Sequence, residues 1–280
     1  MTGLENLKNI AAKIRKELFI TVYNGGGGHI GGALSSVEIM TALYFGGVLK
    51  YDPRNPEDAE RDRFILSKGH SSTLLYTTLA NAGFISAQTL ATYGKPDTRL
   101  GGHPKIGDIP GVEATTGALG HGLCFATGIA LAAKLDGKNY GTYVLLGDGE
   151  CQEGSVWEAA LFAAQRRLGR LTAIVDYNKL QAMDKLCNII GLESLAGKWK
   201  AFGWDVIETN GHDIAQILNA LGGREENHDD APPRAIIAHT VKGKGISFME
   251  NEPLWHYRLP NKEELKIVKT ELNISDEELI

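Results

Sequence analysis

The sequence predicts an α/β protein in which a parallel sheet is flanked by helices on both faces. From about residue 140 onward, expected strands alternate with expected helices, which is the pattern of βαβ units. The strands lack a regular alternation of apolar and polar residues, as is typical when helices cover both faces of a sheet. The expected strands cover 143–146, 171–176, 204–208 and 234–238, and the expected helices cover 153–168, a segment near 191–202 and a segment from Asp213.

The first 70 residues contain two expected helices and one expected strand. An apolar stripe at helical spacing runs through 4–23 and is formed by Leu7, Ile10, Ile14, Leu18 and Val22. A second helix is expected near 36–45, with Ser35 or Ser36 as its N-cap. The charged, proline-containing loop 51–63 then leads into a short strand at 63–66.

We expect a single domain spanning residues 1–280. The polar stretch 222–233 has the composition of a flexible connection, but it lies between an expected helix and an expected strand and does not separate domains. The sequence contains no internal repeat. A short acidic helical tail is expected after Asn261.

Composition and charge exclude several classes of protein. The chain is 43% hydrophobic and 22% charged, a globular balance that excludes disorder. Its net charge of -5, without a basic block, argues against nucleic-acid binding. Three cysteines without a C-x-x-C pair give neither a disulfide framework nor a zinc ribbon. With no secretory signal and no membrane segment, we expect a soluble protein of the reducing cytoplasm.

Glycine is enriched, and histidines follow several of the glycines. The 34 glycines make up about 12% of the chain, against a usual ~7%. Clustered glycines mark sharp turns or a close approach of backbone to a ligand. The five histidines that directly follow a glycine are His29, His70, His103, His121 and His212. This arrangement indicates a site on glycine loops, although we expect His212, like His228, at the surface.

A carboxylate and an amide follow two of the expected strands. Asp148 lies in Gly147-Asp-Gly149 directly after strand 143–146, and Asn178 follows strand 171–176. Gly-Asp-Gly alone is a common turn. If the two strands are neighbours, however, the oxygens of Asp148 and Asn178 meet at the carboxyl edge of the sheet, where open α/β sheets bind ligands. Such oxygens suit Mg²⁺ with phosphate, and a helix starting near Glu153 would direct its N-terminus to the same place.

The chain resembles the N-terminal half of the transketolase family in seven motifs, which occur in that family's order over nearly the whole sequence. Gly-Asp-Gly followed about 30 residues later by Asn is also similar to the thiamine diphosphate signature. The motifs are Gly-His-Ile-Gly-Gly-Ala-Leu at 28–34, Ser-Lys-Gly-His at 67–70, Gly-His-Pro at 102–104, Thr-Thr-Gly-Ala-Leu-Gly-His-Gly at 115–122, Gly-Asp-Gly-Glu-Cys-Gln-Glu-Gly at 147–154, Asp-Tyr-Asn-Lys-Leu-Gln at 176–181, and 242–251 with Trp255-His256.

This resemblance implies the thiamine diphosphate-binding fold and a set of cofactor ligands. Asp148, Asn178 and the backbone carbonyl of Leu180 would hold Mg²⁺. The metal ion and Gly149 would bind the diphosphate, with help from His70. After Leu180 the sequence departs from the family pattern, since it lacks the glycine that is often found in this loop.

The resemblance also assigns residues to the reacting end of the cofactor. Gly117 and Leu119 would lie against its thiazolium and pyrimidine region. Four histidines would line the substrate channel, where imidazole can donate or accept a proton near neutrality. They are His29, His70, His103 and His256. The family usually has Gly where this chain has Tyr257, and many members have Gln where it has His121.

Glu153 has two equal interpretations. It is either an ordinary carboxylate at a helix N-terminus, worth under about 1 kcal/mol, or a residue at a subunit interface near the cofactor, as in the family. The cysteines Cys151 and Cys187 show no evident thiol chemistry.

The implied function is that of a transketolase-type subunit that transfers a two-carbon ketol unit from a ketose to an aldose. Alternatives are the alpha subunit of a 2-oxo-acid dehydrogenase, a deoxyxylulose-phosphate synthase relative, and a non-catalytic cofactor-binding protein. The histidines disfavour a mere diphosphate binder, which has no use for His29 and His103. A Rossmann dehydrogenase is disfavoured because the glycines of 117–122 have the wrong order and do not follow a strand.

The resemblance implies a partner chain as well. Fused transketolases are more than twice as long as this sequence, and their second α/β domain supplies the glutamate that activates the pyrimidine ring. We therefore expect a separate subunit with the pyrimidine-binding domain, two copies of each chain in a heterotetramer, and sugar or sugar-phosphate substrates.

Overall fold

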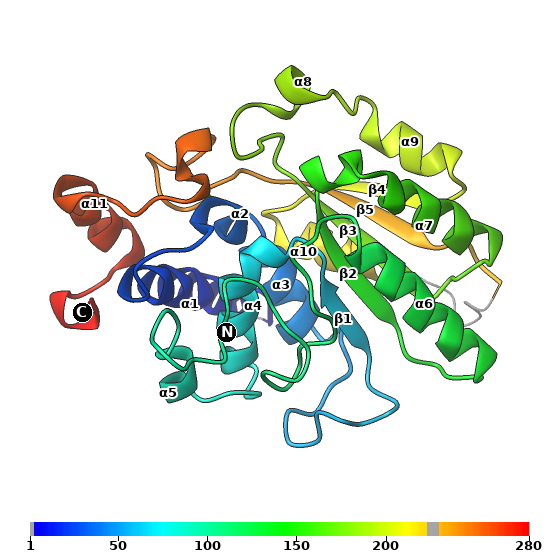
Figure 1. Ribbon diagram of the computed structural model, residues 1–280, viewed down its shortest axis with the longest axis horizontal. Helices are drawn as coiled ribbons and strands as arrows, with labels where there is room; N and C mark the ends of the chain where they lie inside the picture. Colours follow the sequence, from blue (N-terminus) through cyan, green and yellow to red (C-terminus); the bar gives the residue numbers. More distant parts are fainter. Residues whose placement is uncertain (1–2, 223–229, 280) are drawn as a thin grey trace.

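The computed structural model describes residues 3–222 and 230–279, within which the strands form one parallel sheet (Figure 1). Its order is β1-β2-β3-β5-β4, and every neighbouring pair is parallel. The bounds are Arg63–Leu66 for β1, Thr142–Gly147 for β2, Leu171–Tyr177 for β3, Asp205–Asn210 for β4 and Arg234–His239 for β5. Each expected strand is found within two residues of its predicted ends, and the predicted α/β fold with a parallel sheet is confirmed.

Helices cover both faces of the sheet, as the apolar strands predicted (Figure 1). Leu145 packs toward one face and its neighbours Val144 and Leu146 toward the other, and all three are fully buried. One face carries α1 (Gly3–Asn24), α3 (Val37–Phe45), α4 (Ser72–Asn81) and α10 (Ile214–Leu221), and the other carries α6 (Gly122–Leu135), α7 (Gly154–Gln165) and α9 (Leu195–Ala201).

The first helix forms where its apolar stripe predicted it. Leu7, Ile14, Leu18 and Val22 are buried against the core, while Ile10 is half-buried. Because these residues recur every three or four positions, they share one face, which packs on α3 and α4.

Several short or fully buried helices were not predicted. α4 and α6 lack the amphipathic stripe by which a helix is recognised, because apolar or small residues cover much of their surface. In α4, eight of the ten residues, Ser72 to Leu79, are buried. The others are α2 (Ile30–Leu34), α5 (Ala87–Leu90) and α8 (Leu186–Ile189).

Two predicted helices have different boundaries. The segment expected as one helix over 153–168 is preceded by a 3₁₀ turn at Gly149–Gln152, and α7 itself ends at Gln165. The helix expected near 191–202 begins only at Leu195, because the Ser194 side chain caps it by accepting from the Gly197 N–H.

The N-cap of α3 is Ser36, but its hydroxyl makes no capping hydrogen bond, which corrects the predicted role. The Ser36 hydroxyl accepts from Lys68 instead. At the C-terminal end, the tail forms α11 (Lys262–Leu272), where Asn261 and Glu264 complete a capping box. Further 3₁₀ turns lie at Gly69–Ser71, Pro253–His256 and Asp276–Glu278.

The sheet brings the predicted ligands together. β2 and β3 are neighbours, and Gly147 lies opposite Asp176 in their register, so Asp148 and Asn178 leave the sheet at the same edge. Of the connection 222–233, residues 223–229, including His228, lie outside the described residues. None of the helices in the described ranges is both long and apolar enough to cross a membrane.

Candidate functional site

A cavity of about 390 Å³ lies at the carboxyl edge of the sheet. It is formed by the segments that follow β1, β2, β3 and β5, together with the turn before α2 and the loop before α6. Its lining includes every residue that the sequence analysis assigned to the site: His29, His70, His103, Gly117, Leu119, Asp148, Gly149, Glu153, Asn178, Leu180 and His256.

The four predicted histidines form one cluster around His29. The centroid of the His29 ring lies 5.4 Å from that of His70, 5.9 Å from that of His103 and 5.1 Å from that of His256. Three of them are partly buried and His103 is exposed. Residues from four distant parts of the sequence therefore present imidazoles to one small volume.

Local backbone geometry holds these histidines. His29 is the residue before α2, and His70 lies in the 3₁₀ turn after β1. The His103 ring packs against Gly117, where a Cβ would come within 3.1 Å of the ring. Gly117 has a φ of +143°, so both its conformation and this contact require glycine.

The surroundings keep three of the histidines neutral. Burial, with positive charge on Lys242 nearby, lowers the pKa of His256 to about 4. Burial and the neighbouring His103 lower the pKa of His29, and burial together with Lys68 holds that of His70 well below its ordinary value. Lys242 Nζ lies 3.2 Å from His256 Nδ1 and can only donate, so the proton of this imidazole is on Nε2. Neutral imidazoles can both donate and accept protons.

Asp148 is buried directly after β2, at the N-terminus of the 3₁₀ turn Gly149–Gln152. One of its carboxylate oxygens accepts from the Gly149 N–H at 2.7 Å and the other accepts from the Lys179 N–H. Burial, with the Asp176 carboxylate nearby, raises the pKa of Asp148 to about 7. A neighbouring cation would stabilise the ionised form of Asp148, because the cation offsets the cost of burying the negative charge.

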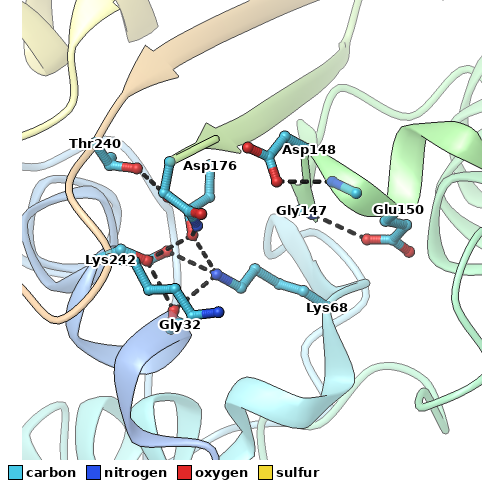
Figure 2. Close-up of polar contacts among 12 residues, drawn as sticks. Gly32, Lys68, Gly147, Asp148, Glu150, Asp176, Thr240 and Lys242 are labelled. Carbon is cyan, nitrogen blue, oxygen red and sulfur yellow. Dashed lines mark hydrogen bonds and ion pairs between the residues drawn. The ribbon is translucent and has the colours of Figure 1, made fainter. Parts of the chain in front are cut away.

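A buried ion pair lies directly beneath the cavity (Figure 2). The Lys68 ammonium donates to the Asp176 carboxylate and, at 2.7 Å, to the Gly32 carbonyl. Burial alone would raise the pKa of Asp176, but the Lys68 charge and the hydroxyls of Ser35 and Thr240 outweigh it and lower that pKa. Both charges are therefore retained inside the protein.

Glu150 connects three loops around the cavity. Its carboxylate accepts from the Ser67 hydroxyl and from the Gly120 N–H at 2.9 Å. It also accepts from the Gly147 N–H at 3.0 Å (Figure 2). Burial raises the pKa of Glu150, and these donors oppose that rise. This carboxylate thus fixes the loop of Gly117 and Leu119 relative to the end of β2.

The sequence analysis missed the charged residues that support the histidines. Four charged residues appeared in the quoted motifs, but no role was assigned to them: Lys68, Glu150, Asp176 and Lys242. For Lys68 a usable signal was its position just after an apolar strand. The expectation that His212 lies at the surface is wrong, since it is partly buried. His212 Nδ1 lies 3.0 Å from Glu38 and its Nε2 accepts from the Val241 N–H, next to Lys242.

Comparison with known proteins identifies the family. The family model described as "Transketolase, thiamine diphosphate binding domain" matches residues 7–279. The chain belongs to the transketolase family. It is 43% identical over 276 residues to an apulose-4-phosphate transketolase subunit of Phocaeicola vulgatus, covering 99% of this chain and 97% of that protein. It is 40% identical over 267 residues to the 6-deoxy-6-sulfo-D-fructose transketolase subunit SqwG of a Clostridium species, covering 95% and 96%.

A solved transketolase shares the fold of the whole chain. The Pichia stipitis enzyme in complex with sedoheptulose 7-phosphate superposes with a TM-score of 0.89 at 28% identity, covering 98% of this chain and 41% of that one. The chain thus spans about two fifths of the length of that transketolase. The predicted identity as a transketolase-type N-terminal, thiamine diphosphate-binding chain is confirmed.

The residues in the cavity fit a diphosphate with a hard cation. Asp148, Asn178 and Leu180 offer carboxylate, amide and carbonyl oxygens, which Mg²⁺ prefers. In the described ranges, no three His, Cys, Asp or Glu side chains are grouped as a metal centre. Gln181 Nε2 is shielded from solvent and finds no acceptor among the described residues. It lies against Gly149, where a Cβ would meet this side chain at 3.0 Å.

We predict that Asp148→Ala abolishes detectable Mg²⁺-dependent binding of thiamine diphosphate in the assembled enzyme, because it removes the anionic ligand of the metal. Titration calorimetry with and without Mg²⁺ measures this affinity. Asp136→Ala removes an exposed carboxylate at the end of α6 and is the matched control. An unchanged affinity in Asp148→Ala would show that the metal assignment is wrong.

We also predict that acid destabilises the chain partly through His256. Because its folded pKa of about 4 lies below the unfolded value near 6.5, the unfolded chain binds the proton more readily. The contribution of neutral His256 to the free energy of unfolding is fully present above about pH 6.5 and is lost as the pH falls toward 4. In urea unfolding, His256→Gln should reduce the slope of stability against pH in this window by up to about one proton. An unaltered slope in His256→Gln would contradict the prediction.

Proposed function

We propose that this chain is the diphosphate-binding subunit of a two-chain transketolase that uses thiamine diphosphate and Mg²⁺ to transfer a two-carbon ketol unit from a ketose to an aldose. One observation carries the proposal: four histidines share a single cavity with Asp148 and Asn178. A protein that only held the cofactor would need the oxygens of Asp148 and Asn178, but not a cluster of imidazoles beyond them.

The cofactor would be held at its diphosphate end by this chain. Asp148, Asn178 and the carbonyl of Leu180 would bind Mg²⁺, while the Gly149 region, His70 and Gln181 would contact the diphosphate. Lys242 adds a positive charge in the same cavity, although burial and the nearby Lys68 lower its pKa to about 8. Gly117 and Leu119 would lie against the rings. Of the two interpretations of Glu153, which is exposed at the start of α7, we propose the place at the subunit interface.

The histidines would handle the protons of the sugar. The chemistry that bound thiamine diphosphate supplies is a nucleophilic carbon able to attack a ketose carbonyl. His29, His103 and His256 would exchange protons with the hydroxyl and carbonyl oxygens of the substrate. The low pKa values of His29 and His256 favour this role, because each imidazole enters the reaction neutral.

A partner subunit would complete the site. The transketolase relatives whose length this chain matches are themselves named as single subunits of a transketolase, and we propose that here too a second chain carries the pyrimidine-binding domain. Exposed apolar residues on α6 and α7 support this, since Phe125 is 45% and Leu161 is 61% exposed. Such patches mark interaction surfaces. We propose two copies of each chain, with residues 1–280 as a single domain.

The substrates and the compartment follow from the relatives and the thiols. The relatives are named for apulose 4-phosphate and 6-deoxy-6-sulfo-D-fructose, so we propose a sugar or sugar phosphate as substrate. All three cysteines are free thiols. We therefore propose a reducing, cytoplasmic location.

The partner requirement is tested by purifying the chain alone and together with the product of the neighbouring gene. Ketol transfer with thiamine diphosphate and Mg²⁺ is then assayed on sugar-phosphate pairs. We expect activity only from the two-chain assembly, because the carboxylic acid that activates the pyrimidine ring lies on the partner. Full activity from the isolated chain would overturn the split arrangement.

We expect His29→Ala and His103→Ala to lower turnover of the assembled enzyme by about 10²–10⁴-fold, the usual loss when a positioned acid–base group is removed. Affinity for thiamine diphosphate should stay close to that of the wild type, because these residues address substrate oxygens. His121→Ala, at an exposed position, is the control. Wild-type turnover in both variants would exclude His29 and His103 as acid–base groups.

A further inference from the structure

The Asp176 carboxylate has four side-chain donors, one of which belongs to a proposed metal ligand. Asp176 is the penultimate residue of β3 and has no exposed surface. One oxygen accepts from Lys68, from the Ser35 hydroxyl at 2.6 Å and from Asn178 Nδ2 at 3.1 Å, while the other accepts from Thr240. Lys68, Ser35 and Thr240 come from the end of β1, the α2–α3 junction and the end of β5 (Figure 2).

This contact decides which way the Asn178 amide faces. An ionised carboxylate only accepts hydrogen bonds, so the NH₂ end of the amide must face Asp176. The oxygen end is then turned away, where it also accepts from the Leu180 N–H at 3.0 Å. Asn178 lines the cavity that contains Asp148, and a cation in that cavity needs the amide oxygen rather than its nitrogen.

Lys68 keeps the carboxylate an acceptor. Lys68 is 1% exposed, and its ammonium is also held by the Gly32 carbonyl and the Ser36 hydroxyl, so it stays beside Asp176. An opposite charge at this distance favours the ionised carboxylate.

We propose that Asp176, paired with Lys68, is a positioning residue that turns the amide oxygen of Asn178 toward the metal ion. The inference rests on the proposed function, in which Asn178 is a ligand of Mg²⁺. Groups that orient metal ligands in this way typically contribute 10–100-fold to metal affinity. Asp176 itself is not among the residues that line the cavity.

The test exchanges the two residues. In Asp176→Asn, the charge that holds the Lys68 ammonium in place is lost. Once Lys68 no longer fixes the new amide, either end of that amide can pair with Asn178, so the orientation of Asn178 is no longer fixed. In Asn178→Asp, two carboxylates face each other. The double variant Asp176→Asn/Asn178→Asp again pairs an amide with a carboxylate, and the carboxylate at 178 offers oxygen at both ends. The single variants should therefore bind the metal more weakly, and the double variant should recover affinity.

The probe is Mn²⁺, measured by electron paramagnetic resonance at a fixed concentration of thiamine diphosphate on the full chain assembled with its partner. We expect about 10–100-fold weaker Mn²⁺ binding in Asp176→Asn and at least partial recovery in the double variant. Thr240→Val is the matched control, because it removes a donor from the other oxygen of Asp176 and leaves Asn178 untouched. It should bind Mn²⁺ close to the wild-type affinity.

Thermal unfolding without ligands identifies variants that fail to fold. If Asp176→Asn does not fold, the comparison of Asn178→Asp with the double variant still decides: tighter Mn²⁺ binding in the double variant supports the proposal, and equal or weaker binding overturns it. Wild-type affinity in a folded Asp176→Asn overturns this inference and leaves the proposed function intact. No thiamine diphosphate-dependent Mn²⁺ binding by the wild type would overturn the cation site itself, and this inference with it.

Discussion

The buried pair of Lys68 and Asp176 is the constraint on which the arrangement of the site depends. Replacing a buried ion pair by apolar residues is often neutral, whereas removing one partner costs about 3–5 kcal/mol because a lone charge is left in the interior. Here the pair joins the segment after β1 to the end of β3, and its partners lie in α2, at the α2–α3 junction and just after β5. Its contribution is therefore to the relative placement of these segments, which carry His29, His70 and Asn178, more than to stability alone.

The same charges set the protonation of the cavity. Lys68 and Lys242 disfavour additional positive charge, and together with burial they hold the nearby imidazoles neutral. Asp148 feels the opposite influence, because Asp176 and burial both oppose its ionisation. In this cavity a cation would stabilise the Asp148 carboxylate, and an anion would stabilise the ammonium groups of Lys68 and Lys242. A magnesium diphosphate supplies both charges together, so the electrostatics of this chain match the cofactor of its family.

Local patterns in the sequence predicted the sheet and the edge at which Asp148 and Asn178 meet, since apolar strands and the residues after them can be recognised without tertiary information. Helices buried on most sides, such as α4, lack an amphipathic stripe and were missed. The Lys68–Asp176 pair could not be predicted because its members are 108 residues apart, on strands separated by β2. The role of His212 depends likewise on the packing of α3 against α10.

Enriched glycine is explained by how the loops meet at the cavity. The His103 ring occupies the space that a side chain at position 117 would need. In the same way, the Gln181 side chain occupies the space that a side chain at position 149 would need. Segments that approach this closely leave little freedom to the side chains they carry, which is what a site must provide to hold reacting groups in position. In this chain, glycine clusters next to histidines therefore indicate a rigid, closely packed site rather than flexible connections. The same reasoning explains why the histidines on glycine loops at 29, 70 and 103 meet in the cavity. His212 also follows a glycine, but it contacts the loop of Lys242 instead, where it accepts from the Val241 N–H.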